Sequence, residues 1–233
     1  MTMSYIHKHS LYLLLFTFLG SLASMQAQER FTGYWEPQVS INYGVTGVYS
    51  HNFSLTNRIY LIDVGEVRPK LRQFELGHFS KLKIRDDQSL ALGIQYRLRN
   101  NFDGGANQLR ITQQYSLNHS PFVLRFGHRL RAEQQFHKDF TIHRFRYRFA
   151  VDFPLQGQKV DPGEPYLVGS LEQLLSVQKG ASPEYDARLV GQVGWELEPG
   201  LKLQMGLEYR LEEYNSDLPQ SILMLLTSAQ LSL

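Results

Sequence analysis

The ten residues from Arg144 to Phe153 constrain the fold of this chain more than any other segment, because charged and apolar side chains alternate along them. A period of two is that of a β-strand, in which successive side chains point to opposite faces. With the period of an α-helix the arginines would scatter around the axis, and no separate face would form. The segment is therefore predicted to be a strand with two unlike faces. One face carries Phe145, Tyr147, Phe149, Val151 and Phe153, and the other carries Arg144, Arg146, Arg148 and Asp152.

Similar alternating segments follow one another along most of the chain, and turn residues such as Asp103–Gly105 and Glu198–Gly200 separate them. These segments have about eleven to fourteen residues, which exceeds the usual strand of a soluble sheet and is enough for a tilted strand to cross a bilayer. The pattern predicts an all-β fold, an antiparallel transmembrane β-barrel. About eleven segments are recognisable, whereas bacterial barrels of this class have even strand numbers. We therefore expect about twelve strands, with Trp35–His51 divided into two, and about ten as the alternative.

The apolar faces of these strands can point either into the protein or out of it. A soluble β-sandwich or lipocalin-like barrel would bury them and expose the arginines, and an outer-membrane barrel would do the reverse. Gly, Gln and Ser, with a balance of Arg and Glu, make up the polar faces, unlike the Lys-rich surface of a soluble protein. We therefore expect the apolar faces to meet lipid, and keep a soluble periplasmic ligand-binding β-barrel as an alternative. Aromatic residues recur near the segment ends, as in the girdles of membrane barrels: Tyr96, Tyr115, Tyr166, Tyr185, Trp195, Tyr209 and Tyr214.

Arginines that point into a barrel need carboxylate partners, because a lone buried charge is costly and the guanidinium fork suits a carboxylate. The alternation places acidic and basic residues of several strands on one predicted inner face. This lumen charge network either fills a narrow barrel as structural support or lines a narrow pore for small polar solutes. Its predicted members are Arg129, Arg131, Glu133, Arg144, Arg146, Arg148, Asp152, Glu172, Arg188, Glu208, Arg210 and Glu212.

The N-terminus has the three parts of a secretory signal peptide. His7, Lys8 and His9 form a weakly basic start, Leu11–Leu22 is apolar, and small residues follow up to Ala27. The apolar run is too short for a comfortable transmembrane helix. We expect a cleaved signal peptide over residues 1–27 and an outer-membrane barrel of a Gram-negative bacterium over residues 28–233.

The composition excludes several classes of function. The chain has no cysteine, and therefore no acylated cysteine anchor, disulfide or thiolate metal site. Its formal net charge of +2 gives no electrostatic reason to bind nucleic acid. We expect a monomer without cofactor or bound metal, whose partners are outer-membrane lipid and the barrel-insertion machinery.

Parts of the chain resemble a known group of proteins. His128–Gln135, Arg144–Arg148, Glu172 in a following strand and Gly206–Arg210 are similar to the outer-membrane barrels of Bacteroidetes-like bacteria that form domain-of-unknown-function family 2490. The resemblance covers residues 28–233. It implies a signal peptide, a barrel fold and a place in the outer membrane. It implies no activity, ligand or catalytic residue.

Catalytic chemistry finds little support in the sequence, and we expect no enzyme activity. Acyl hydrolysis would need a serine and a histidine together on the lipid face, but His128 is predicted outside and Ser116 inside. His51, His119 and His137 are assigned to turns, and His78 and His143 to strand ends. No two histidines share a face at a metal-binding spacing. A lipid-modifying outer-membrane enzyme remains the second alternative.

Overall fold

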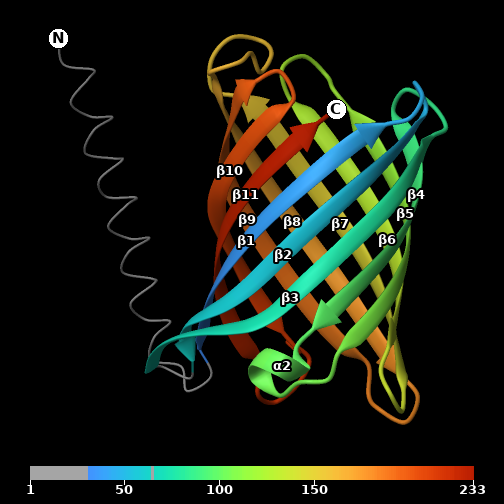
Figure 1. The fold of residues 1–233 in the computed structure, drawn as a ribbon, viewed down its shortest axis with the longest axis vertical. Coiled ribbons are helices and arrows are strands. Elements are labelled where there is room, and N and C mark those ends of the chain that lie inside the picture. Colours follow the sequence, from blue (N-terminus) through green and yellow to red (C-terminus); the bar gives the residue numbers. More distant parts are fainter. Residues whose placement is uncertain (1–30, 64–65) are drawn as a thin grey trace.

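The computed structural model describes residues 31–63 and 66–233, which form one closed β-barrel (Figure 1). Because residues 1–30 lie outside the described part, the predicted signal peptide lies outside it too. A short helix, α2 (Asn100–Asp103), is found at the lower end in Figure 1. The strands are β1 (Thr32–Gly44), β2 (Tyr49–Asp63), β3 (Glu66–Lys83), β4 (Gln88–Leu98), β5 (Gln108–His119), β6 (Arg125–Phe136), β7 (Thr141–Pro154), β8 (Pro165–Gln178), β9 (Glu184–Glu198), β10 (Leu201–Glu212) and β11 (Gln220–Ser232).

The described residues contain eleven strands, so the prediction of twelve, and the alternative of ten, were both wrong. Each strand pairs with its neighbour in sequence, and β1 closes the barrel by pairing with β11 in parallel, from Thr32 beside Ile222 to Asn42 beside Ser232. A closed barrel must have an even number of strands only if every pair of neighbouring strands is antiparallel. With an odd number, the last strand runs in the same direction as the first, and the closing pair must be parallel.

The N-terminal segment also differs from the prediction. Trp35–His51 does not contain an additional strand: its first part belongs to β1, which ends at Gly44, residues 45–48 form a connection, and its last three residues begin β2, which continues to Asp63. The alternation in β1 is harder to read from sequence because Tyr34 and Ile41 lie on opposite faces, and both faces therefore carry large apolar groups.

The two ends of the barrel are defined here by the connections that they carry. The upper end in Figure 1, where β1 and β11 end, carries connections 45–48, 84–87, 120–124, 155–164 and 199–200. The lower end carries α2 within residues 99–107, together with connections 137–140, 179–183 and 213–219.

The barrel wall has its polar side chains inside and its large apolar side chains outside. Leu92, Leu130 and Leu171 point outward and are 65%, 52% and 59% exposed, respectively. Along β1 and β4 to β11, no outward position carries Asp, Glu, Lys or Arg. The buried polar side chains include Gln108, Arg110, Thr112, Glu133, Gln135, Glu172, Glu208 and Arg210. A water-soluble protein has the opposite distribution.

An apolar cluster lies on the inner wall toward the lower end. Tyr34, Tyr60, Ile222 and Met224 are buried there, and Leu226 packs against them. The guanidinium group of Arg72 lies over the rings of both tyrosines, 4.8 Å from the centre of Tyr34 and 5.4 Å from that of Tyr60. These contacts fill the lumen between β1, β2, β3 and β11.

No helix among the described residues is both long and apolar enough to cross a membrane.

Candidate functional site

The structure places the twelve residues of the predicted lumen charge network on the inner wall of β6 to β10. β6 and β7 supply seven of them, because the period of two holds along both strands and their register aligns the charged positions. Arg129 pairs across the strands with Arg148, Arg131 with Arg146, and Glu133 with Arg144. Three adjacent pairs therefore hold five arginines and one glutamate on this part of the wall.

The Glu172 carboxylate is the centre of the ion pairs on this wall. Its Oε2 lies 3.3 Å from Nη2 of Arg129, and its Oε1 lies 3.4 Å from Nη1 of Arg188 and 3.7 Å from Nη1 of Arg146. The Glu172 side chain is only 8% exposed. One buried carboxylate thus neutralises part of the charge of three guanidinium groups from β6, β7 and β9.

Glu133 extends this group of ion pairs toward the lower end. Its Oε2 accepts a hydrogen bond from Nη2 of Arg146 at 2.8 Å and another from Nε2 of Gln135 at 3.3 Å. The Glu133 side chain is 1% exposed. Because Arg146 contacts both carboxylates, Glu133, Arg146, Glu172, Arg129 and Arg188 form one connected set, called the charge layer below.

The side chains of the charge layer are largely shielded from water. Glu133, Arg146 and Arg188 are exposed by only 1%, 10% and 11%. A cavity of about 280 Å³ lies next to the layer, lined almost entirely by charged and amide side chains.

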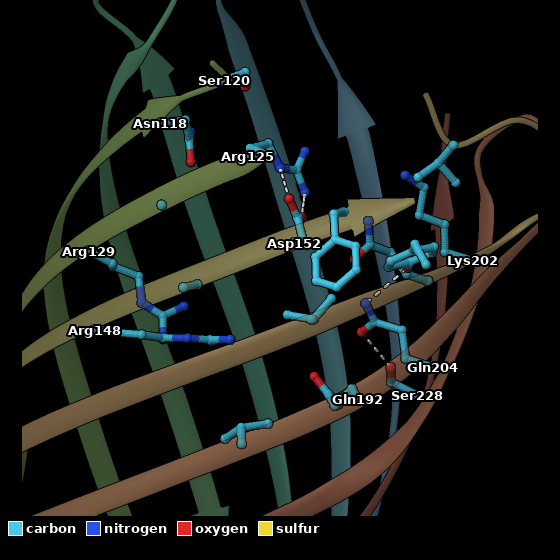
Figure 2. Close-up of a pocket in the computed structure, with 18 of the residues that line it drawn as sticks. Asn118, Ser120, Arg125, Arg129, Arg148, Asp152, Gln192, Lys202, Gln204 and Ser228 are labelled. Atoms are coloured by element: carbon cyan, nitrogen blue, oxygen red, sulfur yellow. Dashed lines mark hydrogen bonds and ion pairs between the residues drawn. The ribbon is translucent and has the colours of Figure 1, made fainter. Parts of the chain in front are cut away.

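A much larger cavity, of about 1240 Å³, occupies the upper half of the barrel (Figure 2). Connections 120–124 and 155–164 contribute to its lining, which places its mouth at the upper end. We call it the vestibule. Its polar lining includes Arg125, Arg129, Arg148, Asp152, Lys202 and Gln204.

A family model described as protein of unknown function, DUF2490, matches residues 32–220, which runs from the start of β1 to the start of β11. The chain belongs to the DUF2490 family. The resemblance noted in the sequence is thereby confirmed. No curated protein is similar enough to this chain to count as a match.

Not every predicted member of the network is held by an ion pair in this DUF2490 barrel. Nε of Arg131 donates to Oε1 of Gln114 at 2.7 Å, and Nε of Arg144 donates to Oγ of Ser176 at 2.9 Å. Asp152 is separate from the charge layer and accepts from Nε of Arg125 at 2.9 Å near the upper end. Glu208 and Arg210 bond to each other along β10.

Further ion pairs on β1 to β5 belong to the same lumen and were missed in the sequence. Oε2 of Glu36 lies 2.5 Å from Nη2 of Arg58. Oε2 of Glu75 lies 2.8 Å from Nη2 of Arg97 and 3.5 Å from Nη2 of Arg110. The sequence pattern that identifies inward charged residues was present here too, because Glu75 and Arg97 stand at alternating polar positions like those of β7.

The short helix α2 lies at the lower end of the barrel, directly before the turn residues Gly104 and Gly105. Oδ2 of Asp103 accepts from the Tyr60 hydroxyl at 3.0 Å, and Oδ1 lies 3.5 Å from Nζ of Lys70. The ring of Phe102 packs on Phe74 of β3, with 5.4 Å between ring centres. These contacts attach the helix to the wall of β2 and β3.

His137 stands in the connection 137–140, as predicted, and contacts the inner wall. Its Nε2 lies 2.8 Å from Nε2 of Gln108. Burial first, and then the nearby charges of Arg110 and Arg99, lower the pKa of His137. The neutral imidazole is therefore favoured at this end of the lumen.

Two histidines that seemed isolated in the sequence lie together on the outer wall. His51 is in β2 rather than in a turn, and His78 lies inside β3 rather than at its end. Nδ1 of His51 is 3.0 Å from Nε2 of His78 and 3.2 Å from Oγ of Ser80. Sequence spacing could not reveal this contact, because it depends on the register between β2 and β3, which sets His51 opposite Ser80. By contrast, His128 lies outside beside Tyr147, and Ser116 lines the vestibule.

The described residues contain no group of three or more His, Asp or Glu side chains placed to hold a metal ion.

Proposed function

We propose that this protein is a monomeric, non-enzymatic β-barrel that crosses the outer membrane of a Gram-negative bacterium, with a lumen closed by its charge layer. The observation that carries the proposal is the inverted polarity of the barrel wall. Burying an apolar side chain the size of leucine is worth about 1.5–3 kcal/mol, so an outer wall of such side chains is unfavourable in water. In lipid the same wall is favourable, and a closed barrel leaves no unpaired backbone edge.

The composition of the wall supports this placement. The outward positions of β1 and β4 to β11 carry no charged side chain over their whole length. Aromatic residues stand near both ends of β9, with Tyr185 toward the lower end and Trp195 toward the upper end. Bacterial outer-membrane barrels carry girdles of aromatic residues at the two membrane interfaces.

Cell fractionation tests this proposal. We expect the full-length protein in the detergent-extracted outer-membrane fraction, with a gel mobility that changes on heating. Recovery of the folded protein from the soluble periplasmic fraction would contradict the proposal and favour the soluble ligand-binding barrel.

A closed lumen predicts that the wild-type protein produces no current steps in a planar lipid bilayer. Replacing both Glu133 and Arg146 with alanine removes the 2.8 Å ion pair of the charge layer, and we expect this double variant to conduct. Because both charges are removed together, neither partner is left unpaired. The matched control replaces Lys83 and Asp86 with alanine, an ion pair at the rim of the upper end. Steady current steps from the wild type would show that the lumen is an open pore.

One observation favours a second function, modification of a lipid ester at the outer wall. Ser80 and His51 contact each other beside an apolar groove of about 930 Å³, which Ser80, Leu92 and Phe145 help to line. Ser80 Oγ would attack an ester carbonyl while its proton passes to Nδ1 of His51. The departing alcohol would take that proton, and water would release the fatty acid. The arrangement lacks one part of a catalytic triad, because no described residue bonds the other ring nitrogen of His51.

An esterase assay separates the two functions. If the first proposal is right, the purified barrel in micelles releases no nitrophenol from a nitrophenyl fatty-acid ester, and the variants Ser80→Ala and Ser182→Ala give the same result. Ser182 is an exposed serine in the connection 179–183, far along the chain from the groove. Release that is lost only in Ser80→Ala would favour the enzyme.

A further inference from the structure

The vestibule has its mouth at the upper end of the barrel, and Arg129 of the charge layer lies at its inner end, called its floor below. Neutral hydrogen-bonding groups line much of its wall. Figure 2 shows Asn118 and Ser120 toward the mouth, Gln192, Gln204 and Ser228 on the opposite wall, and Arg129 and Arg148 below Arg125. Its volume of about 1240 Å³ exceeds the range of about 300–1,000 Å³ that is common for small-molecule sites. A ligand of several rings would fit inside it together with water.

Every acidic side chain that lines the vestibule already has a basic partner. Oε2 of Glu196 lies 3.2 Å from Nζ of Lys202, and Asp152 is bonded by Arg125. Glu36 and Glu208 are bonded by Arg58 and Arg210, respectively. The acids are thus neutralised within the protein and leave no charge to attract a cation.

Three basic side chains that line the same cavity have no such partner. Arg148, Lys81 and Lys159 form no ion pair and no side-chain hydrogen bond with any residue that the structure describes. The net charge of the side chains that line the vestibule is therefore positive. Its excess charge is divided between the floor, where Arg148 lies, and the upper part of the wall and mouth, where the two lysines lie.

Arg148 has no partner even though the strand register places a carboxylate beside it. Arg148 stands between Arg129 on β6 and Glu172 on β8. The carboxylate of Glu172 is held by Arg129, Arg146 and Arg188 and does not reach Arg148 within 4 Å. Nε of Arg129 and Nε of Arg148 are both buried and lack a hydrogen-bond acceptor. Figure 2 shows the two guanidinium groups close together and extending into the cavity.

We propose that the vestibule binds a small, water-soluble anion that carries a phosphate or carboxylate group, with Arg148 and Arg129 as the residues that hold this group. Two guanidinium forks from adjacent strands can donate several charge-assisted hydrogen bonds to such a group. The bound anion also offsets the repulsion between the two like charges. The amide of Gln192 forms no side-chain hydrogen bond with a described residue and is available for a hydroxyl group on the rest of the ligand. This binding site does not require that the barrel crosses a membrane. It can therefore be tested with the purified protein alone.

Titration calorimetry of the purified full-length barrel in micelles tests the site, with inorganic phosphate and citrate as separate probes. We expect saturable binding of at least one probe, weakened at least about tenfold by Arg148→Gln. Arg148→Gln removes no ion pair, so the fold is expected to persist, and heat-modifiable gel mobility checks this. Arg85→Gln, an exposed arginine in the connection 84–87 outside the cavity, is the matched control and should bind as the wild type does.

Two outcomes would overturn the proposal. One is that neither probe binds the wild type. The other is equal affinity in the wild type and Arg148→Gln, which would place the anion elsewhere. Phosphatidylglycerol added to the micelles tests a lipid headgroup as the source of the phosphate. Displacement of the bound probe by this lipid would overturn the assignment to a water-soluble ligand, and unchanged binding would support it.

Discussion

Replacing Leu171 with arginine is expected to stop the barrel from folding into lipid vesicles at the wild-type yield. Leu171 lies near the middle of β8, points outward and is 59% exposed. If this face meets lipid, a charged side chain at mid-depth costs about 2–4 kcal/mol. That is a large part of the stability of a protein of this size. The measurement is the fraction of protein that folds into phosphatidylcholine vesicles from urea, read from the gel mobility shift.

The matched control is Leu218→Arg. Leu218 is 60% exposed, almost the same as Leu171, but it lies in the connection 213–219 at the lower end, outside the strands. We expect this variant to fold at the wild-type yield. If the wall faced water, both substitutions would be tolerated, since surface replacements usually change stability by less than about 0.5 kcal/mol. Equal yields for the two variants would therefore refute membrane crossing through β8.

Most of the barrel wall could be predicted from the sequence because the relevant signal is local. In β10 apolar and polar residues alternate from Leu201 to Glu212, and the strand has these same bounds. The period of two also decides which face each side chain occupies, as for Arg146 and Tyr147 in β7. Which of the two faces points into the barrel is not decided by the period of two, and was predicted from the Gly, Gln and Ser on the polar faces and their balance of Arg and Glu.

Features that depend on closure or on register could not be predicted. The predicted strand number was wrong because the closing pair of β1 and β11 is parallel. This pairing joins residues almost two hundred positions apart, so no local pattern reveals its direction. Asn118–Pro121 has the composition of a turn, but β5 extends to His119 and β6 begins only at Arg125, so the connection lies further along the chain. Between them Phe122 has a positive φ of 59°, a conformation that is uncommon for a bulky residue.

The partners within the charge layer were beyond prediction for the same reason. The inner face of β8 offers one carboxylate, Glu172, to the arginines of two neighbouring strands. Which of them it bonds depends on side-chain reach across the lumen. Arg129, two strands away, is bonded, whereas the directly paired Arg148 is not. This difference is what leaves Arg148 available to a ligand.

Replacing Glu172 with glutamine is expected to give the largest loss of stability of any single change in the charge layer. Glutamine keeps the volume and removes the charge that three guanidinium groups share. Removing one partner of a buried ion pair typically lowers the free energy of unfolding by about 3–5 kcal/mol, because the remaining charge stays buried without compensation. The free energy of unfolding in urea, followed by the fluorescence of Trp35 and Trp195, measures the loss. Glu198→Gln, an exposed glutamate at the end of β9, is the control and should unfold as the wild type does.

A second substitution separates the charge effect from a packing effect. The double variant carries both Glu172→Gln and Arg129→Gln. It lacks the negative charge of Glu172 and also one of the positive charges that Glu172 compensates. If unpaired charge causes the loss, the double variant is more stable than Glu172→Gln alone, and the coupling between the two positions is positive in a double-mutant cycle. If the side chains merely fill space, the two losses add. A result in which Glu172→Gln unfolds at the wild-type urea concentration would mean that water reaches these arginines, and that the charge layer does not close the lumen.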